Sequence, residues 1–309
     1  MIQYHRALIG AAILCVSVGC NKGPSTIDPP AKPPANTAVK SLKRGIAYNI
    51  PYAEDLAALK NGVSWWYNWG MTPNAGVPAN YNQAYNMDFI PMLWGGNTST
   101  ADMTTVKNFI LAHPEVRYLL VMNEPNLTDQ ANRTPAQAAA DWTKYEQVIA
   151  DLANQGRTIY LVGPAITWGT LSGYSNPVVW LDAFYAAYQS ANGGKNPKID
   201  YLAFHWYDYG LTAQLNSLQK YGKKIWITEL ANWNSQINSY AKQEAQMQSM
   251  VDSCERRSDV FRYAWFIGRG SNTDTHFTWL FTSTPGQLSE LGQLYISLPF
   301  DTLNSTSGI

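Results

Sequence analysis

The strongest constraint on the fold is a regular alternation of short strand-like runs with segments of helical character. Eight runs rich in β-branched and aromatic residues recur along the chain, and helical patterns separate most of them. Several runs are apolar throughout, as strands buried on both faces of a parallel sheet must be. The predicted strands are Gly45–Tyr48, Val63–Tyr67, Phe89–Trp94, Tyr118–Met122, Ile159–Val162, Tyr201–Trp206, Ile225–Thr228 and Tyr263–Ile267.

Three of the intervening segments predict helices with defined features. Thr134, Pro135 and Gln137 supply an N-cap, a proline in the first turn and a capping-box partner. Asn176-Pro177 begins a second helix in a similar way. A third segment carries an apolar stripe at helical spacing, formed by Met247, Met250, Val251 and Cys254.

This alternation over about 260 residues predicts a single α/β domain, a (β/α)8 TIM barrel within residues 41–309. A doubly wound open sheet is the alternative, because the alternation alone does not decide whether the sheet closes. The irregular segment from Gly70 to Met87 is expected to form a loop at the rim of the barrel.

The N-terminal part of the chain predicts export. Residues 1–19 have the layout of a signal peptide, with Arg6 ahead of an apolar run from Ala7 to Val18. The sequence that ends at Cys20 resembles a bacterial lipobox and predicts lipidation, with ordinary cleavage and release as the alternative. Residues 20–40 are rich in proline and predict a semi-rigid tether. We therefore expect a cell-surface or periplasmic lipoprotein, or a secreted protein.

Composition narrows the class of ligand. The formal net charge is zero, so the chain lacks the basic field that nucleic-acid binding requires. The four histidines are scattered without metal-ligand spacing, and we expect neither a metal nor a cofactor. Aromatic residues (13%) are nearly as frequent as charged ones (14%), which favours a ligand with flat apolar faces, such as a sugar. Nothing in the sequence requires more than a monomer.

Two glutamates stand directly after predicted strands. Glu124 follows the fourth strand and Glu229 follows the seventh. A carboxylate at the end of an apolar strand is costly unless it is paired or used. The carboxyl ends of these two strands lie across the mouth of a barrel from each other, so the side chains can converge. The alternative is that each glutamate forms a buried ion pair, for example with Arg117 or Arg269.

Two convergent carboxyl groups are what glycoside cleavage needs. One protonates the leaving oxygen, and the other attacks the anomeric carbon or activates a water molecule. A separation of about 5–5.5 Å allows direct attack and retention of configuration. Other side chains at strand ends and on the following loops alternate hydrogen-bonding groups with aromatic rings, as a sugar site would. The predicted sugar-binding residues are Asn68, Asn97, Asn123, Trp66, Trp69, Trp94, His205, Tyr207, Trp233 and Trp265.

Specific motifs then connect the chain to a known family. Asn123-Glu124-Pro125 and Thr228-Glu229 resemble the signature of clan A glycoside hydrolases. The runs Gly62–Trp69, Phe89–Trp94 and His205–Tyr207 resemble glycoside hydrolase family 128, whose members act on β-1,3-glucans. The resemblance extends from about Lys43 to Phe300 and implies a (β/α)8 barrel.

The resemblance also implies roles for individual residues. Glu124 takes the position of the general acid/base, and Glu229 that of the nucleophile. Asn123 matches the asparagine that binds the sugar 2-hydroxyl, Tyr207 the tyrosine that holds the nucleophile, and Trp265 the platform under the sugar.

One departure from the clan concerns the support of the nucleophile. Many clan members carry an arginine near the second strand for this purpose, whereas no arginine lies between Val63 and Asn86. We expect Asn68, His205 or Tyr207 to provide that support.

The leading hypothesis is therefore a retaining endo-β-1,3-glucanase. Another β-glycanase of the clan, acting on β-1,4-glucan or mannan, would use the same glutamates. A surface lipoprotein that binds glycan without cutting it would use the aromatic residues alone.

Overall fold

The computed structural model describes residues 39–270 and 275–302. The chain divides into two units, Met1–Asn36 and Thr37–Ile309. The predicted signal peptide, Cys20 and nearly all of the predicted tether lie outside the described residues. Within the described ranges, no helix is both long enough and apolar enough to cross a bilayer.

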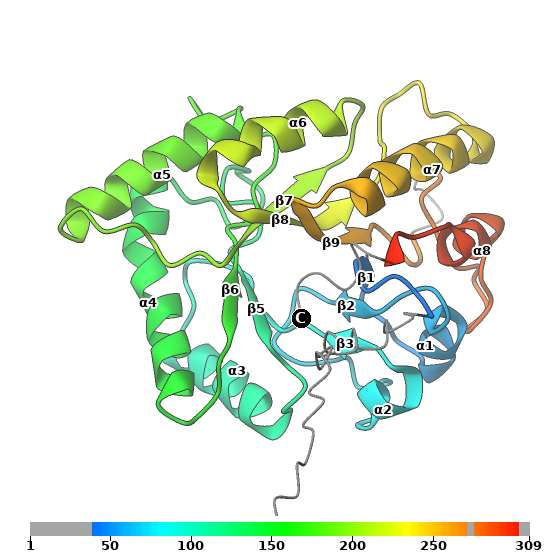
Figure 1. Cartoon of the computed structure of the whole chain (residues 1–309), viewed down its shortest axis with the longest axis horizontal. Coiled ribbons are helices and arrows are strands. Elements are labelled where there is room, and N and C mark those ends of the chain that lie inside the picture. The colour runs from blue at the N-terminus through cyan, green and yellow to red at the C-terminus, as the bar shows by residue number, and fades with distance from the viewer. Residues whose placement is uncertain (1–38, 271–274, 303–309) are drawn as a thin grey trace, which may run out of the picture. The chain divides into compact units, whose positions relative to one another are not determined.

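One parallel sheet forms the centre of the described domain, and helices surround it (Figure 1). The strand order is β3-β2-β1-β9-β8-β7-β6-β5-β4, so strands that follow one another in the chain are mostly neighbours. This is the order of an α/β barrel and not of a doubly wound sheet. The strands are β1 (Arg44–Ala47), β2 (Trp65–Tyr67), β3 (Asp88–Phe89), β4 (Met92–Leu93), β5 (Tyr118–Val121), β6 (Tyr160–Val162), β7 (Tyr201–Trp206), β8 (Lys224–Leu230) and β9 (Val260–Trp265).

The sheet has nine strands where eight were expected, because the predicted strand Phe89–Trp94 is divided in two. Ile90 and Pro91 separate β3 from β4, and proline has no N–H with which to continue a ladder. The Ile90 N–H bonds to the carbonyl of Trp66 on one side, at 3.0 Å. The Pro91 carbonyl accepts from Leu120 on the other side, also at 3.0 Å. The two edge strands of the row are thus consecutive in the chain.

The helices begin where the local signals predicted. Thr134 and Gln137 form the capping box of α4, and Asn176 accepts a hydrogen bond from Val178 at the start of α5. The apolar stripe of α7 is buried. The segment from Gly70 to Met87 also contains a short helix, α2. The helices are α1 (Ala53–Leu59), α2 (Tyr81–Tyr85), α3 (Thr100–Ala112), α4 (Pro135–Ala153), α5 (Pro177–Ala191), α6 (Leu211–Leu218) with a 3₁₀ turn (Gln219–Tyr221), α7 (Tyr240–Arg256) and α8 (Glu290–Ser297).

The hydrophobic core has two layers because side chains alternate along each strand. One layer fills the inside of the curved sheet and includes Trp65, Tyr67 and Trp226. The other lies between the sheet and the helices and includes Trp66 and Trp265. Neighbouring residues of one strand therefore face different environments, and this decides which aromatic residues can reach a ligand.

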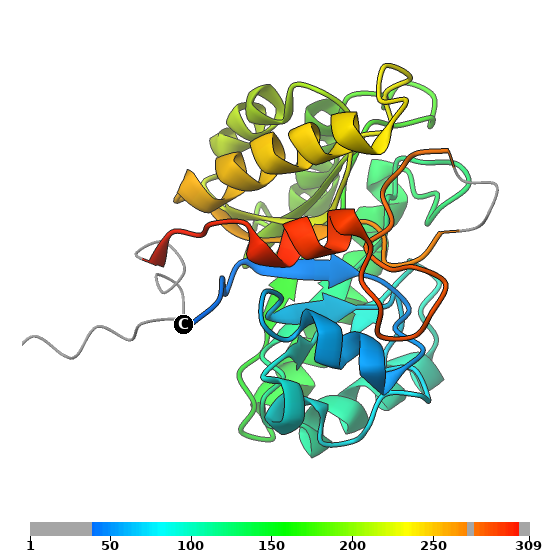
Figure 2. The same cartoon turned by 90° about the vertical axis from the view of Figure 1, so that its right-hand side faces the viewer.

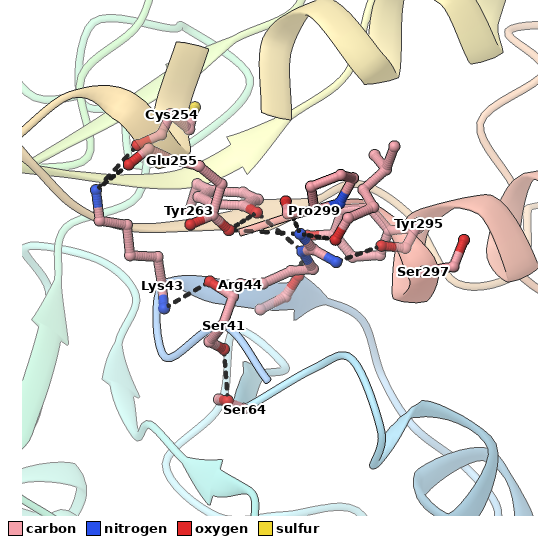
Figure 3. Close-up of polar contacts among 12 residues, drawn as sticks. Ser41, Lys43, Arg44, Ser64, Cys254, Glu255, Tyr263, Tyr295, Ser297 and Pro299 are labelled. Atoms are coloured by element: carbon pink, nitrogen blue, oxygen red, sulfur yellow. Dashed lines mark hydrogen bonds and ion pairs between the residues drawn. The ribbon is translucent and has the colours of Figure 1, made fainter. Parts of the chain in front are cut away.

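A set of cations holds the start of β1 to the ends of two helices (Figure 3). The Lys43 Nζ donates to the carbonyls of Cys254, Glu255 and Arg257 at the C-terminal end of α7, at 2.9 to 3.1 Å. The Arg44 guanidinium donates to the carbonyls of Tyr295, Leu298 and Pro299 at the end of α8, at 2.7 to 3.0 Å. We call these contacts the N-terminal clamp.

The clamp places the positive charges of Lys43 and Arg44 against the partly negative ends of α7 and α8. Helix C-termini carry partial negative charge and unpaired carbonyls, which cations satisfy. Figure 2 shows α8 alongside β1, and Tyr295 of α8 donates to the Gly45 carbonyl at 2.6 Å. The clamp lies at the N-terminal ends of the strands, whereas Glu124 and Glu229 stand at the C-terminal ends.

Candidate active site

Glu124 and Glu229 meet at the C-terminal ends of β5 and β8, together with His205 of β7. One carboxylate oxygen of each glutamate and one ring nitrogen of His205 all lie within 4.8 Å of one another. All three side chains are buried. Within the described residues, these three side chains are also the group that could hold a metal ion. Hydrogen-bond donors, however, already bind the Glu229 carboxylate.

Glu124 is held in an unusual backbone conformation. Its φ of 44° lies in the left-handed region, which costs free energy for any residue with a side chain. Its N–H donates to the Ala165 carbonyl at 2.8 Å, and the Glu124 carbonyl accepts from Leu127 at 3.0 Å. Burial raises the pKa of Glu124, and the hydrogen bond and charge of His205 partly oppose that rise. The negative charge of Glu229 adds to it.

Three neutral groups donate hydrogen bonds to Glu229. The Tyr67 hydroxyl and the Trp69 Nε1 donate to its Oε1 at 2.9 and 2.7 Å. The Tyr207 hydroxyl donates to Oε2. Burial, reinforced by the charge of Glu229, raises the pKa of Tyr67 and Tyr207 well above the ordinary value, so both remain donors.

His205 links the two carboxyl groups. Its Nδ1 lies 2.8 Å from Oε1 of Glu124 and 3.4 Å from Oε2 of Glu229, and its Nε2 lies 2.8 Å from the Thr228 hydroxyl. The register of β7 against β8 shifts after Phe204, which sets His205 opposite Glu229. Burial alone lowers the pKa of His205, but the charges of Glu229 and Glu124 outweigh it and raise the pKa overall.

The two glutamates line the central part of a longer cleft. The central cavity, of about 510 Å³, is also lined by the predicted residues Asn123, Trp69, Trp94, Tyr207 and Trp233. A cavity of about 410 Å³ shares Trp69 and Trp94 with it and extends to Asn97. A third, of about 310 Å³, shares Tyr207 and Trp233 and extends to Trp206. Shared lining residues thus connect spaces on both sides of the central cavity.

Comparison with known proteins agrees with this geometry. A family model described as glycosyl hydrolase catalytic core matches residues 45–295. A solved endo-β-1,3-glucanase of family 128, subgroup II, from Pseudomonas viridiflava is 53% identical, with a TM-score of 0.79. The match covers 85% of this chain and 100% of that one. The chain belongs to glycoside hydrolase family 128.

More distant proteins are also similar. A subgroup I endo-β-1,3-glucanase from Amycolatopsis mediterranei, solved with laminaritriose, is 25% identical with a TM-score of 0.62, over 83% of this chain and 99% of that one. Alkali-sensitive linkage protein 1 of Schizosaccharomyces pombe is 29% identical over 83% of this chain. The matched region spans only 45% of that curated relative's length.

Four residues predicted to bind sugar line none of these cavities of this glycoside hydrolase: Trp66, Trp265, Asn68 and His205. The two tryptophans face away from the cleft. Trp66 is fully buried on the outer face of β2, with its ring centroid 5.0 Å from that of Tyr81. Trp265 is fully buried on the outer face of β9, and its Nε1 donates to the Thr278 carbonyl at 2.9 Å. The expected sugar platform is therefore not Trp265, and Phe266, the next residue, lines the central cavity instead. Alternation of side chains along a strand explains both corrections.

Of the three residues expected to support Glu229, Tyr207 donates to it and His205 lies 3.4 Å from it, whereas Asn68 contacts neither glutamate. Its amide donates to the Thr72 carbonyl and to Asn74, at 2.9 and 2.8 Å, and so holds the loop that follows β2. Tyr67 and Trp69, its two neighbours, contact Glu229 in its place. The alternative of buried ion pairs also fails, because Arg269 pairs with Asp55 and Arg117 lies over the Tyr160 ring.

Sequence reasoning left several residues of the site unassigned. Tyr67 donates to Glu229, but it stands in a strand of three aromatic residues whose pattern does not show which of them faces inward. Trp168 lies just after Ile166, which bridges to Phe204, and so occupies a position equivalent to a strand end. Gln130 lies on the loop after Glu124 and carries no motif that would single it out.

Proposed function

We propose that this family 128 member hydrolyses β-1,3-glucan with retention of configuration, using Glu124 as acid/base and Glu229 as nucleophile. The observation that carries the mechanism is the closeness of the two carboxyl groups, whose oxygens lie within 4.8 Å. Retaining enzymes have carboxyl groups about 5–5.5 Å apart, whereas inverting enzymes need about 6.5–9.5 Å to admit a water molecule. The substrate follows from the two solved relatives, both endo-β-1,3-glucanases.

The reaction divides into two displacements. In the first, Glu229 attacks the anomeric carbon while protonated Glu124 gives its proton to the leaving oxygen. The raised pKa of Glu124 favours the protonated form that this step needs. In the second, Glu124, now ionised, takes a proton from water, and the water breaks the ester to Glu229.

Tyr67, Trp69 and Tyr207 serve the nucleophile in this scheme. Their donors stabilise its negative charge and hold the carboxylate in one orientation. Together they take the role that an arginine near the second strand has in many clan members.

Endo action is favoured by the form of the cleft. Space continues on both sides of the central cavity, so a glucan chain can extend past the cleavage point in both directions. The aromatic rings of Trp94 and Trp168, both partly exposed, offer flat surfaces for sugars along that path.

The decisive experiment measures reducing ends released from linear β-1,3-glucan, with β-1,4-glucan and mannan in parallel. We expect release from the first alone, and the first product seen by NMR should be the β-anomer. Release from another glycan would show that the substrate assignment is wrong. A first product that is the α-anomer would contradict retention of configuration. Binding without any release would favour a glycan-binding role.

Two variants test the roles of the glutamates. Glu229→Gln should abolish turnover and leave binding of laminari-oligosaccharides nearly unchanged. Glu124→Ala should regain activity on an aryl glycoside when azide is added, because azide attacks the glycosyl-enzyme without a general base. Exposed Glu54→Gln is the matched control and should be unaffected.

Two further proposals concern the whole chain. The row of strands would close into an eight-stranded barrel, with β3, Ile90, Pro91 and β4 acting as one interrupted strand between β2 and β5. The chain would be exported and lipidated at Cys20, which mass spectrometry of the mature N-terminal peptide can test.

A further inference from the structure

Gln130 is joined to the residue that precedes the proposed acid/base. The Nδ2 of Asn123 donates to Oε1 of Gln130 at 3.2 Å. The other amide atom of Asn123, Oδ1, is buried and has no hydrogen-bond partner within the described part of the chain. Asn123 and Gln130 both line the central cavity with Glu124 and Glu229.

The chain connects these two residues tightly. The Ala131 N–H donates to the Asn123 carbonyl at 3.1 Å, and the Arg133 N–H donates to the Pro125 carbonyl at 2.8 Å. The loop after Glu124 thus folds back on its own beginning and returns Gln130 to the side of Asn123.

A buried acceptor without a partner is costly, and it persists where a ligand will supply the missing donor. A primary amide can rotate by half a turn and exchange its acceptor with its donors. With the Gln130 oxygen facing Asn123, the reversed Asn123 amide would set two oxygens against each other unless the Gln130 amide also turned, so the present pairing favours Nδ2 toward Gln130 and leaves Oδ1 free for a ligand.

We propose that Gln130 is a positioning residue, which orients Asn123 so that its Oδ1 accepts a hydrogen bond from the sugar hydroxyl next to the anomeric carbon. The inference rests on the proposed hydrolysis. Hydrogen bonds to the 2-hydroxyl strengthen as the transition state forms. The contribution of Gln130 therefore depends on the presence of that hydroxyl in the substrate.

The test compares two aryl glycosides of laminaribiose, one normal and one lacking the 2-hydroxyl on the sugar that is cleaved. Gln130→Met removes the acceptor with little change in side-chain length. We expect it to lower kcat/KM about tenfold on the normal substrate, as the loss of one oriented hydrogen bond would. On the 2-deoxy substrate it should change kcat/KM less than about twofold, because no hydroxyl remains for Asn123 to bind.

Two further variants complete the design. Gln130→Glu keeps an acceptor at the same position and should retain most activity on the normal substrate at its own optimum pH. Exposed Gln147→Met is the matched control on α4 and should match the unmodified chain on both substrates.

Each outcome bears on the proposal. An equal loss on both substrates would show a purely structural role and overturn it, as would no loss on either. A Gln130→Glu variant as impaired as a folded Gln130→Met would also overturn it. If Gln130→Met does not fold, Gln130→Glu is compared with the unmodified chain, and a folded Gln130→Glu variant that loses most of its activity on the normal substrate would overturn the proposal. If the unmodified chain cleaves neither glycoside nor the polymer, the proposed function fails first and the inference fails with it.

Discussion

Glu229 is surrounded by hydrogen-bond donors that carry no formal charge of their own. Two of them, Tyr67 and Trp69, come from the end of β2 and the residues that follow it. An indole N–H cannot accept a proton, so Trp69 can only stabilise the ionised carboxylate. Trp69 also borders both the central cavity and its neighbour, so one side chain contacts Glu229 and lines two cavities.

Removing this N–H should slow the chemistry more than it weakens binding. For Trp69→Phe we expect kcat to fall about tenfold to a hundredfold, the range for losing a hydrogen bond to a charged group. KM should change less than about threefold, since a ring remains in the cleft. Steady-state kinetics on a soluble laminari-oligosaccharide measure both quantities.

Trp66→Phe is the control for Trp69→Phe. The Nε1 of Trp66 has no hydrogen-bond partner in the described structure, and its ring packs against Tyr81 away from the cleft. It should lower stability slightly and leave kcat unchanged. A large fall in kcat for Trp66→Phe, or none for Trp69→Phe, would contradict the assignment of these two residues.

We expect His205 to influence the alkaline limit of activity through its hydrogen bond to Glu124. Burial raises the pKa of Glu124, while the hydrogen bond and charge of His205 lower it. In His205→Asn the lowering influence is lost, so the pKa of Glu124 rises further, with the charges of Glu229 and Asp129 still acting to raise it. A general acid works below its pKa, so the alkaline limb of kcat/KM should move to higher pH.

A pH profile of the purified variant measures this shift. His113→Asn is the distant control, because His113 lies at the C-terminal end of α3. An alkaline limb that stays in place or moves to lower pH would contradict the role given to His205.

Residue-scale prediction succeeded where one rule applied and failed where two competed. The two glutamates were found because an unpaired carboxylate at the end of an apolar strand is conspicuous in any sequence. Trp66 and Trp265 were misplaced because an aromatic residue satisfies the core and a sugar equally well. A strand of three residues, such as β2, is too short for its alternation to reveal the inward face.

At the scale of elements, the N-terminal clamp ties the start of β1 to the ends of α7 and α8. Lys43 pairs with three carbonyls that the end of α7 leaves without intrahelical partners. Lys43 and Arg44 are both buried, so water cannot replace them once they are removed. Their effect should appear in stability and not in the chemistry at the opposite end of the strands.

For Lys43→Met we expect the free energy of unfolding to fall by about 2–3 kcal/mol, since three buried carbonyls lose a charged donor. In a domain of this size that is a fall in Tm of about 5–10 °C. Thermal unfolding measured by circular dichroism gives the value, and kcat at low temperature should be unchanged. The exposed Lys195→Met control should stay within about 0.5 kcal/mol. Equal stability of the two variants would contradict the clamp.

Element boundaries followed from the sequence more closely than the strand count did. The caps of α4 and α5 are local hydrogen-bond motifs, and the structure contains both. The division of Phe89–Trp94 depends on Pro91 interrupting a ladder whose partners, β2 and β5, are set by tertiary pairing. Pro91 is visible in the sequence, but only the tertiary pairing shows that it separates a strand paired with β2 from one paired with β5.

On the scale of the whole molecule, the cleft joins residues from most strand ends. Trp168 borders both the central cavity and the third cavity, and its ring is 38% exposed. Its ring lies edge-on to Tyr207, with 5.7 Å between centroids. A glucan long enough to enter the third cavity would cover it, whereas a short one would not.

Trp168→Ala should therefore act in a length-dependent way. We expect kcat/KM to fall about tenfold on a laminari-hexasaccharide, the value of one aromatic stacking contact. The loss on a trisaccharide should be smaller, provided that the trisaccharide occupies the opposite side of the cleft. Product analysis at several chain lengths measures this, and equal losses at all lengths would contradict a glucan path through the third cavity.

The clamp also has a consequence for how the chain acquires its structure. Arg44 bonds to carbonyls 251 to 255 positions further along, and β1 pairs with β9. A ribosome that has released only the first half of the chain has made neither partner. Contacts between such distant segments make folding slow, because the loop between them must close before they form. The first strand can pair with β2 early, but it acquires β9 and the end of α8 only after almost the whole chain has been made.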